Sequence, residues 1–459
     1  MHRFRRCDGY PRAIAARSDS SAAPSEEHLV PSDRPPGQVG ARRLIGAAGL
    51  GVLVSGLILN VYLAVVARAL SPAEYATFGS FWALALVLGF GAFLPLEQEL
   101  ARRLPLPGDR RALLRAATLT AGVLTVIALA VLACALPLLW RALDEDVSVL
   151  LALGALCVVS AVQFLVRGTL IGTDRLVRHG AVMVLDTVLR VGLALGVFLL
   201  GGADAAAFCW ALVAAIAVAH LTQLPGAWRR AVARGDTTTS EPPVTASALT
   251  RATMPLLVGS VCAQLLLNGL PVLVVAQASE GPQTAAAGVF VAAFTLAKAP
   301  LSMVVPLQSA VVPTLTRLIA DGRRHEVRVL LVKGVAALVG VALVGVPLAW
   351  WIGPPVVALI LGADYAISGL DLAVILCGVL AHIGLVVITQ VHVARGRHRD
   401  VALSWGAGLL AAGVTFWVIP GPILAGEIAF LVGSVIGAVV SCSILAVSGR
   451  RSRREEAAS

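Results

Sequence analysis

Twelve stretches of about twenty mostly apolar residues recur along the chain. A helix needs about 20 apolar residues to cross the hydrocarbon core of a bilayer. In lipid, each backbone N–H and C=O must be satisfied inside the protein, which leaves helices and closed barrels as spanning structures. The sequence therefore predicts an all-α integral membrane protein with about 12 transmembrane helices, at residues 44–66, 79–96, 113–139, 147–173, 181–201, 204–227, 252–279, 284–312, 327–352, 367–390, 401–419 and 424–447.

Composition and motifs argue against an enzyme. Of the 459 residues, 58% are hydrophobic and 14% are charged, whereas a soluble domain has about 25% charged residues. The chain has no G-x-x-x-x-G-K-[ST] loop for nucleotide phosphates and no H-E-x-x-H for zinc. Its seven cysteines form no C-x-x-C pair. We therefore expect no catalytic residue, no metal site and no cofactor.

Positive charge alternates from one connection to the next. Apart from Arg68, Arg141, Arg190 and Lys298, all of the 36 Lys and Arg residues lie in or close to the N-terminal tail, every second connection or the C-terminal tail; Arg115, Arg167, Arg328 and Lys333 lie just inside the ends of the adjoining spans. Because cytoplasmic loops carry the excess of Lys and Arg, both termini are predicted to be cytoplasmic. The charge is divided among short segments and forms no continuous basic stripe, so nucleic acid is not an expected partner.

The chain divides near its midpoint. We expect a disordered cytoplasmic tail at 1–41, a six-helix lobe at 42–227, a cytoplasmic linker at 228–251, a second six-helix lobe at 252–448 and a basic cytoplasmic tail at 449–459. The sequence Leu-Ile-Leu-Asn at 57–60 has a counterpart, Leu-Leu-Leu-Asn, at 265–268. Since six helices return the chain to its starting side, the two lobes are predicted to be related by a pseudo-twofold axis along the membrane normal.

Two cationic residues fall deep inside predicted spans, where a charge is costly unless it faces a partner or a watery cavity. Arg190 has Asp186 four residues earlier on the same helical face, which suits either a structural ion pair or a guanidinium that also binds phosphate. Lys298 has no acid three or four residues away, and Pro300 interrupts its span. It is interpreted as a cavity-lining cation or as one partner of a tertiary salt bridge.

Several uncharged or weakly basic polar residues also lie in the spans. They are candidates for hydrogen bonds to sugar hydroxyls or, alternatively, for packing bonds between helices; they are Asn60, Gln163, Gln264, Asn268, His382 and Gln390. His382 is in addition a candidate proton-coupling group. At the cytoplasmic end of the second span, Glu97 and Glu99 are expected to form interfacial pairs with Arg102 and Arg103.

The segment Leu70-Ser71-Pro72-Ala73-Glu74-Tyr75 resembles the L-S-P-x-E-Y/F-G signature of polysaccharide flippases in the multidrug/oligosaccharidyl-lipid/polysaccharide (MOP) exporter superfamily. Ala76 stands where that pattern usually has Gly. The segments at 167–172 and 395–397, interpreted as turns, are also similar to that family. The resemblance implies a flippase of the bacterial cytoplasmic membrane that moves a polyprenyl pyrophosphate-linked oligosaccharide by alternating access, with membrane lipids as partners and room for a coupling ion.

Two other functions are alternatives to a flippase. A drug/cation antiporter of the same superfamily needs an intramembrane carboxylate, but the first and seventh predicted spans contain no acid, and Arg190 is expected to neutralise Asp186. A membrane-embedded glycosyltransferase or ligase needs paired acids or a basic cluster on a sizeable loop, and the connections here are short. A transporter for surface polysaccharide biosynthesis is the favoured interpretation.

Overall fold

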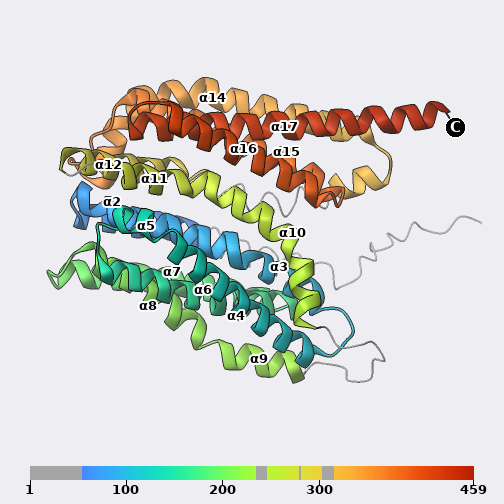
Figure 1. Ribbon diagram of the computed structural model, residues 1–459, viewed down its shortest axis with the longest axis horizontal. Helices are drawn as coiled ribbons and strands as arrows, with labels where there is room; N and C mark the ends of the chain where they lie inside the picture. Colours follow the sequence, from blue (N-terminus) through green and yellow to red (C-terminus); the bar gives the residue numbers. More distant parts are fainter. Residues whose placement is uncertain (1–53, 234–244, 279–280, 302–314, 459) are drawn as a thin grey trace, which may run out of the picture. The chain divides into compact units, whose positions relative to one another are not determined.

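The computed structural model describes residues 54–233, 245–278, 281–301 and 315–458 (Figure 1). Throughout these ranges the regular elements are helices, and ten of them are long and apolar enough to cross a membrane. Two shorter apolar helices, Val54–Ala69 and Pro282–Ala297, fall at the predicted first and eighth spans. The predicted all-α membrane fold is confirmed, whereas the count of 12 spans stays a prediction.

The first half of the described chain follows the predicted order of spans. After Val54–Ala69 come α2 (Pro72–Leu86), η1 (Val87–Phe93), α3 (Leu94–Arg103), α4 (Arg110–Cys134), α5 (Leu136–Ala142), α6 (Val147–Gly172), α7 (Leu176–Leu199), α8 (Ala205–Leu221) and α9 (Leu224–Ala233). Helices α4, α6 and α8 begin after an aspartate whose carboxylate accepts backbone N–H bonds, at Asp109, Asp146 and Asp204. Such caps satisfy donors that have no partner within the helix.

The second half contains the remaining helices. They are α10 (Ala246–Gln264), η2 (Leu265–Gly269), α11 (Leu270–Gln277), α12 (Pro282–Ala297), α14 (Arg324–Leu361), α15 (Gly369–Ala394), α16 (His398–Val418) and α17 (Pro422–Ala458). The π-helical segments η1 and η2 interrupt two long spans and contact each other. Wider turns of this kind frequently occur at functional sites.

Helices α14–α17 lie side by side, drawn from orange to red in Figure 1, and α6 packs against α3, α4, α8 and α9. Glycines permit the closest crossings. A Cβ at Gly433 of α17 would lie 2.7 Å from the carbonyl oxygen of Gly408 in α16. Small residues at helix crossings are the usual means of close packing in membranes, where lipid competes equally for apolar surface.

The predicted domain bounds meet the described structure only in part. The 1–41 tail lies outside the described residues, as does the 234–244 portion of the predicted linker. Helix α9 extends through residue 233 and α10 begins at 246, so both ends of the predicted linker are helical. The division into two lobes and their pseudo-twofold relation stay predictions.

Candidate functional site

Lys298 stands at the end of α12, and its ammonium is held by an amide. Lys298 Nζ donates to Asn268 Oδ1 at 2.9 Å and lies 4.7 Å from the centre of the Phe294 ring. Asn268 Nδ2 in turn donates to Gln264 Oε1 at 2.8 Å. Three predicted site residues are thus brought together in one chain of hydrogen bonds, here called the lysine cluster: Gln264, Asn268 and Lys298.

The lysine cluster depends on how two spans are interrupted. Asn268 belongs to η2 and is buried, while Lys298 forms the C-cap of α12. The predicted span at 284–312 was expected to be interrupted at Pro300, and in the structure α12 ends at Ala297; the segment 302–314 lies outside the described residues. Among the described residues, Lys298 forms no ion pair. Its contacts there are with a neutral amide and a ring, so its positive charge is uncompensated by them.

Asp186 and Arg190 form the expected pair within α7. Arg190 Nη2 lies 2.5 Å from Asp186 Oδ2, and its Nε donates to Oδ1 at 3.1 Å. The two side chains are 12% and 3% exposed, and the guanidinium carbon lies 5.9 Å from the centre of the Trp82 ring. A bidentate pair of this kind largely neutralises both charges. No contact within the described structure joins Arg190 to Lys298.

The other predicted polar residues divide between bonds within a helix and bonds between helices. Asn60 Nδ2 and Gln390 Nε2 donate to carbonyl oxygens four residues earlier in their own helices. His382 Nδ1 lies 3.3 Å from Ser434 Oγ of α17, with its ring between Trp405 and Phe430. Gln163 is buried in α6.

A buried ion pair that the sequence did not indicate joins α3 to α6. Arg167 Nε lies 2.9 Å from Glu97 Oε2, and the side chains are 9% and 7% exposed. The guanidinium also lies 4.8 Å from the Phe164 ring centre. Two expectations are corrected here, because residues 167–172 belong to α6 and form no turn, and Glu97 pairs with Arg167 in place of the interfacial arginines. The position of Arg167 inside the predicted 147–173 span was the available signal.

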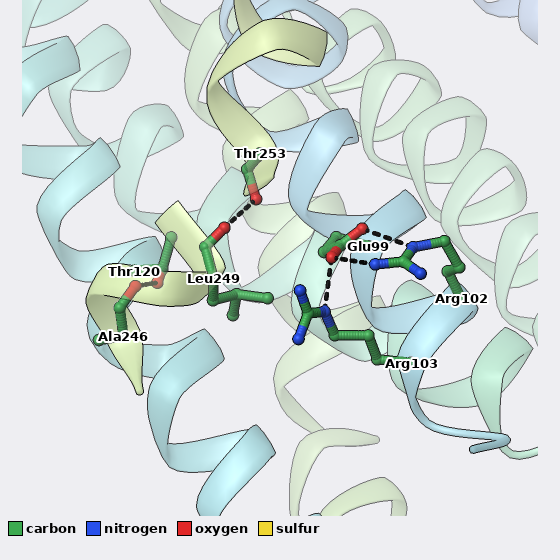
Figure 2. A network of polar contacts seen from close by, with 7 residues as sticks. All are labelled: Glu99, Arg102, Arg103, Thr120, Ala246, Leu249 and Thr253. Carbon is green, nitrogen blue, oxygen red and sulfur yellow. Dashed lines mark hydrogen bonds and ion pairs between the residues drawn. The ribbon is translucent and has the colours of Figure 1, made fainter. Parts of the chain in front are cut away.

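Figure 2 shows that the neighbouring acid, Glu99, behaves as expected. Its carboxylate accepts from Arg102 at 2.7 Å and 2.9 Å, and from Arg103 at 2.5 Å. In the same region Thr120 of α4 lies 3.2 Å from the Thr250 hydroxyl and 3.5 Å from the Ala246 carbonyl oxygen. These contacts hold α10 against the end of the helices at which α4 begins.

Glu427 is a second buried acid that the sequence did not single out. It lies in the first turns of α17 and is 2% exposed. Its Oε1 has no hydrogen-bond partner among the described residues. Glu427, which falls inside the predicted 424–447 span, is therefore a buried carboxylate in addition to Asp186 in the described chain.

The L-S-P-A-E-Y segment starts α2 with a capping box. Ser71 Oγ accepts from the Glu74 backbone N–H, and the Ser71 N–H donates to Glu74 Oε2 at 2.9 Å. Pro72 occupies the first turn, where its missing N–H costs nothing. Tyr75, which follows Glu74, packs edge-on against Tyr365 with ring centres 5.6 Å apart. The segment thus fixes the start of α2 against the connection between α14 and α15.

A group of contacts joins the start of α2 to the end of α14 and to the connection between α14 and α15. Tyr365 Oη donates to the Leu70 carbonyl oxygen at 3.0 Å, and Arg68 Nε donates to the Ile360 carbonyl oxygen at 3.0 Å. Arg68 Nη2 also donates to Leu359 O. Burial raises the pKa of the Tyr365 hydroxyl far above its usual range, so it remains a donor. We call Arg68, Leu70 and Tyr365, with the α14 carbonyls, the α2-end seal; the three residues also line a pocket of about 470 Å³.

Comparisons with known proteins agree on one family. The family model described as polysaccharide biosynthesis protein matches residues 43–319. An uncharacterized protein of Mycobacterium tuberculosis (strain ATCC 25618 / H37Rv) is 31% identical over 388 residues, which cover 80% of this chain and 84% of that protein. A second protein of that strain, also uncharacterized, is 30% identical over 413 residues, covering 88% and 90%.

Solved structures of MOP-superfamily transporters share the fold. A multidrug resistance MATE family transporter in an inward-facing conformation aligns with a TM-score of 0.63 at 13% identity, over 90% of this chain and 100% of that one. The outward-facing conformation of a MATE family transporter gives 0.58 at 15% identity, over 90% and 97%. A MOP-superfamily transporter from Pyrococcus furiosus, for which a reverse polarity of the binding pocket has been described, gives 0.55 at 14% identity, over 88% and 96%.

Proposed function

We propose that this chain, which belongs to the polysaccharide biosynthesis protein family of the MOP superfamily, flips a polyprenyl pyrophosphate-linked oligosaccharide. It is a multi-pass membrane transporter. The substrate would move from the cytoplasmic to the outer leaflet of the cytoplasmic membrane. Both termini would be cytoplasmic, and two six-helix lobes would alternate their access. Family and fold point to a transporter rather than an enzyme.

The lysine cluster is the observation that supports an anionic, phosphate-containing substrate. Among the described residues the Lys298 amine contacts only a neutral amide and a ring, and no acid there offsets a positive charge on it. An anionic phosphate would offset that charge, whereas a cationic drug would be repelled. Asn268 and Gln264 add amide groups that can bond phosphate or sugar oxygens once the ammonium turns to a ligand.

Arg190 is the second proposed phosphate contact, and its pairing with Asp186 makes its role testable. A purely structural pair predicts that Asp186→Asn is as damaging as Arg190→Ala, because either change leaves the partner charge buried and unpaired. A phosphate-binding Arg190 predicts a milder Asp186→Asn variant, since the guanidinium survives. Asn60 and His382 remain proposed contacts of the sugar portion.

The decisive experiment replaces Lys298. In cells that depend on this chain for surface polysaccharide, Lys298→Ala should lower flipping about tenfold or more, because a hydrogen bond to a charged group is worth about 1.5–3 kcal/mol. Intact lipid-linked intermediate should accumulate, measured by extraction and mass spectrometry. Lys298→Arg should retain part of the activity because it keeps the charge but alters the geometry.

Lys333 supplies the matched control, since it is the only other lysine in the chain and is exposed on α14. Lys333→Ala should flip normally. Normal flipping by a well-expressed Lys298→Ala, Arg190→Ala double variant would overturn the phosphate-binding site while leaving the family intact. Accumulation of unjoined sugar units, with no intact intermediate, would indicate a glycosyltransferase or ligase instead.

Glu427 gives the drug/cation antiporter its one supporting observation. A buried carboxylate with an unpartnered oxygen among the described residues can hold a proton or a cation. This alternative predicts efflux of a cationic dye such as ethidium from cells that express the chain. Lost dye efflux in a Glu427→Gln variant, with lipid-linked intermediates unchanged, would favour it over flipping.

A further inference from the structure

Three arginines line a pocket that contains none of the residues of the lysine cluster. The pocket measures about 420 Å³ and is lined by Arg111 and Arg115 of α4 and, from α9, by Trp228, Arg229, Val232 and Ala233. None of its lining residues is acidic. Within the described ranges, none of the three guanidinium groups forms an ion pair.

The fold forces these charges together at a cost. Arg111 and Arg115 are four residues apart and so share one face of α4, a spacing at which like charges repel. Helix α9 packs against both α4 and α6, with Ala227 buried beside Val166 and Leu170. That packing fixes the register of α9 and brings Arg229 to the same pocket. An anion in the pocket would relieve the repulsion among the three charges.

The same face of α4 continues into the membrane as an apolar surface. Leu119 lies four residues after Arg115, and Val126 lies seven residues after Leu119, so the three residues lie nearly in line on the helix. Their side chains are 63% and 67% exposed. Trp228, partly buried against the core, has an amphipathic ring of the kind found at the level of lipid headgroups. A cationic pocket at one end and an exposed apolar stripe beyond it match the two parts of a lipid.

The geometry points to a binding site for the phosphate of an anionic phospholipid, with an acyl chain lying along α4. Helix α4 begins after the connection 104–109, on the side that the charge distribution predicts to be cytoplasmic, so the lipid would belong to the cytoplasmic leaflet. The planar guanidinium groups suit phosphate oxygens. An anionic headgroup fits the pocket better than a phosphatidylcholine headgroup, because the choline group would add a fourth positive charge. The site does not depend on which substrate the chain transports.

Native mass spectrometry of the purified full chain tests this site. Phosphatidylglycerol or phosphatidylcholine is added to the detergent-solubilised protein, and the bound lipid is counted. Each of Arg111→Gln, Arg115→Gln and Arg229→Gln should weaken phosphatidylglycerol binding about fivefold, from about 1 kcal/mol for each basic residue at a lipid surface. The triple variant should bind phosphatidylglycerol no better than phosphatidylcholine.

Arg230 provides the matched control, because it neighbours Arg229 on α9, is exposed and does not line the pocket. Arg230→Gln should bind lipid as the unaltered protein does. A triple Arg→Lys variant should keep most of the affinity, which separates loss of charge from loss of fold. The inference is overturned if the triple Gln variant retains phosphatidylglycerol, if Arg230→Gln loses as much, or if inorganic phosphate at equal concentration displaces the lipid.

Discussion

The buried pair between Arg167 and Glu97 provides a quantitative test of the fold. Removing one partner of a buried ion pair leaves an uncompensated charge and costs about 3–5 kcal/mol. With side chains 9% and 7% exposed and an N–O distance of 2.9 Å, this pair belongs in that class. Arg167→Met keeps an apolar stem of similar reach, so the lost packing is small and the cost falls mainly on the unpaired Glu97.

The double variant separates pairing from burial. Arg167→Met with Glu97→Gln removes both charges and should cost less than Arg167→Met alone, since replacing a buried pair by uncharged side chains is often nearly neutral. Stability would be measured as the free energy of unfolding in mixed detergent and SDS. Glu326→Gln is the comparison, because Glu326 and its partner Arg323 are 47% and 54% exposed. That change should cost about 1 kcal/mol or less.

The reasoning would be refuted in either of two ways. Equal costs for Arg167→Met and Glu326→Gln would show that burial does not govern the α3–α6 pair. A double variant as unstable as the sum of its single variants would show that the two charges act independently. Neither result would bear on the transported substrate, because stability is measured without it.

Two further predictions concern connections outside the spans. Arg68→Ala and Tyr365→Phe each remove contacts of the α2-end seal, and each hydrogen bond is worth about 1 kcal/mol. Either change should raise the labelling of an Ala67→Cys reporter by a membrane-impermeant maleimide several-fold. Unchanged labelling would argue against a seal. Partial burial, with Asp146 and Glu145 nearby, raises the pKa of Asp144. The folded state therefore loses stability as pH rises from the ordinary Asp pKa through the raised one. Asp144→Asn should be the more stable protein above that window, with the difference vanishing below it in pH-dependent thermal melts.

Local patterns predicted the helices because each apolar run carries its own signal. Charge alternation and run length placed α4, α6 and α15 to within a few residues of their observed bounds. The Asp186–Arg190 pair was equally accessible, since both partners lie one turn apart on α7. Such features depend on sequence neighbours alone.

Contacts between distant segments carried no comparable signal. Glu97 and Arg167 are separated by 70 residues, and only the crossing of α3 and α6 shows that they meet. Gly168 permits that crossing, because a Cβ there would lie 3.0 Å from the Glu97 backbone. The bond from Lys298 to Asn268 likewise depends on the wider turns of η2 and on the end of α12. Pro300 signalled the interruption after α12, whereas the wider turns of η2 had no signal in the sequence pattern.

Ala76, the one departure from the flippase signature, is explained by where α2 meets α12. At the crossing the glycines are Gly79, whose added Cβ would overlap Val291 of α12, and Gly288, whose added Cβ would overlap the Pro72 carbonyl oxygen. Gly79 lies three residues after Ala76 and so on the same face of α2, which leaves the close approach intact. Helix α12 thus touches the start of α2 at Gly288 and carries Lys298 at its C-terminal end, about 15 Å further along the axis at 1.5 Å per residue. A helix of this length moves nearly as a rigid body. If opening of the α2-end seal shifts α12, we therefore expect the position of the Lys298 side chain to change as well.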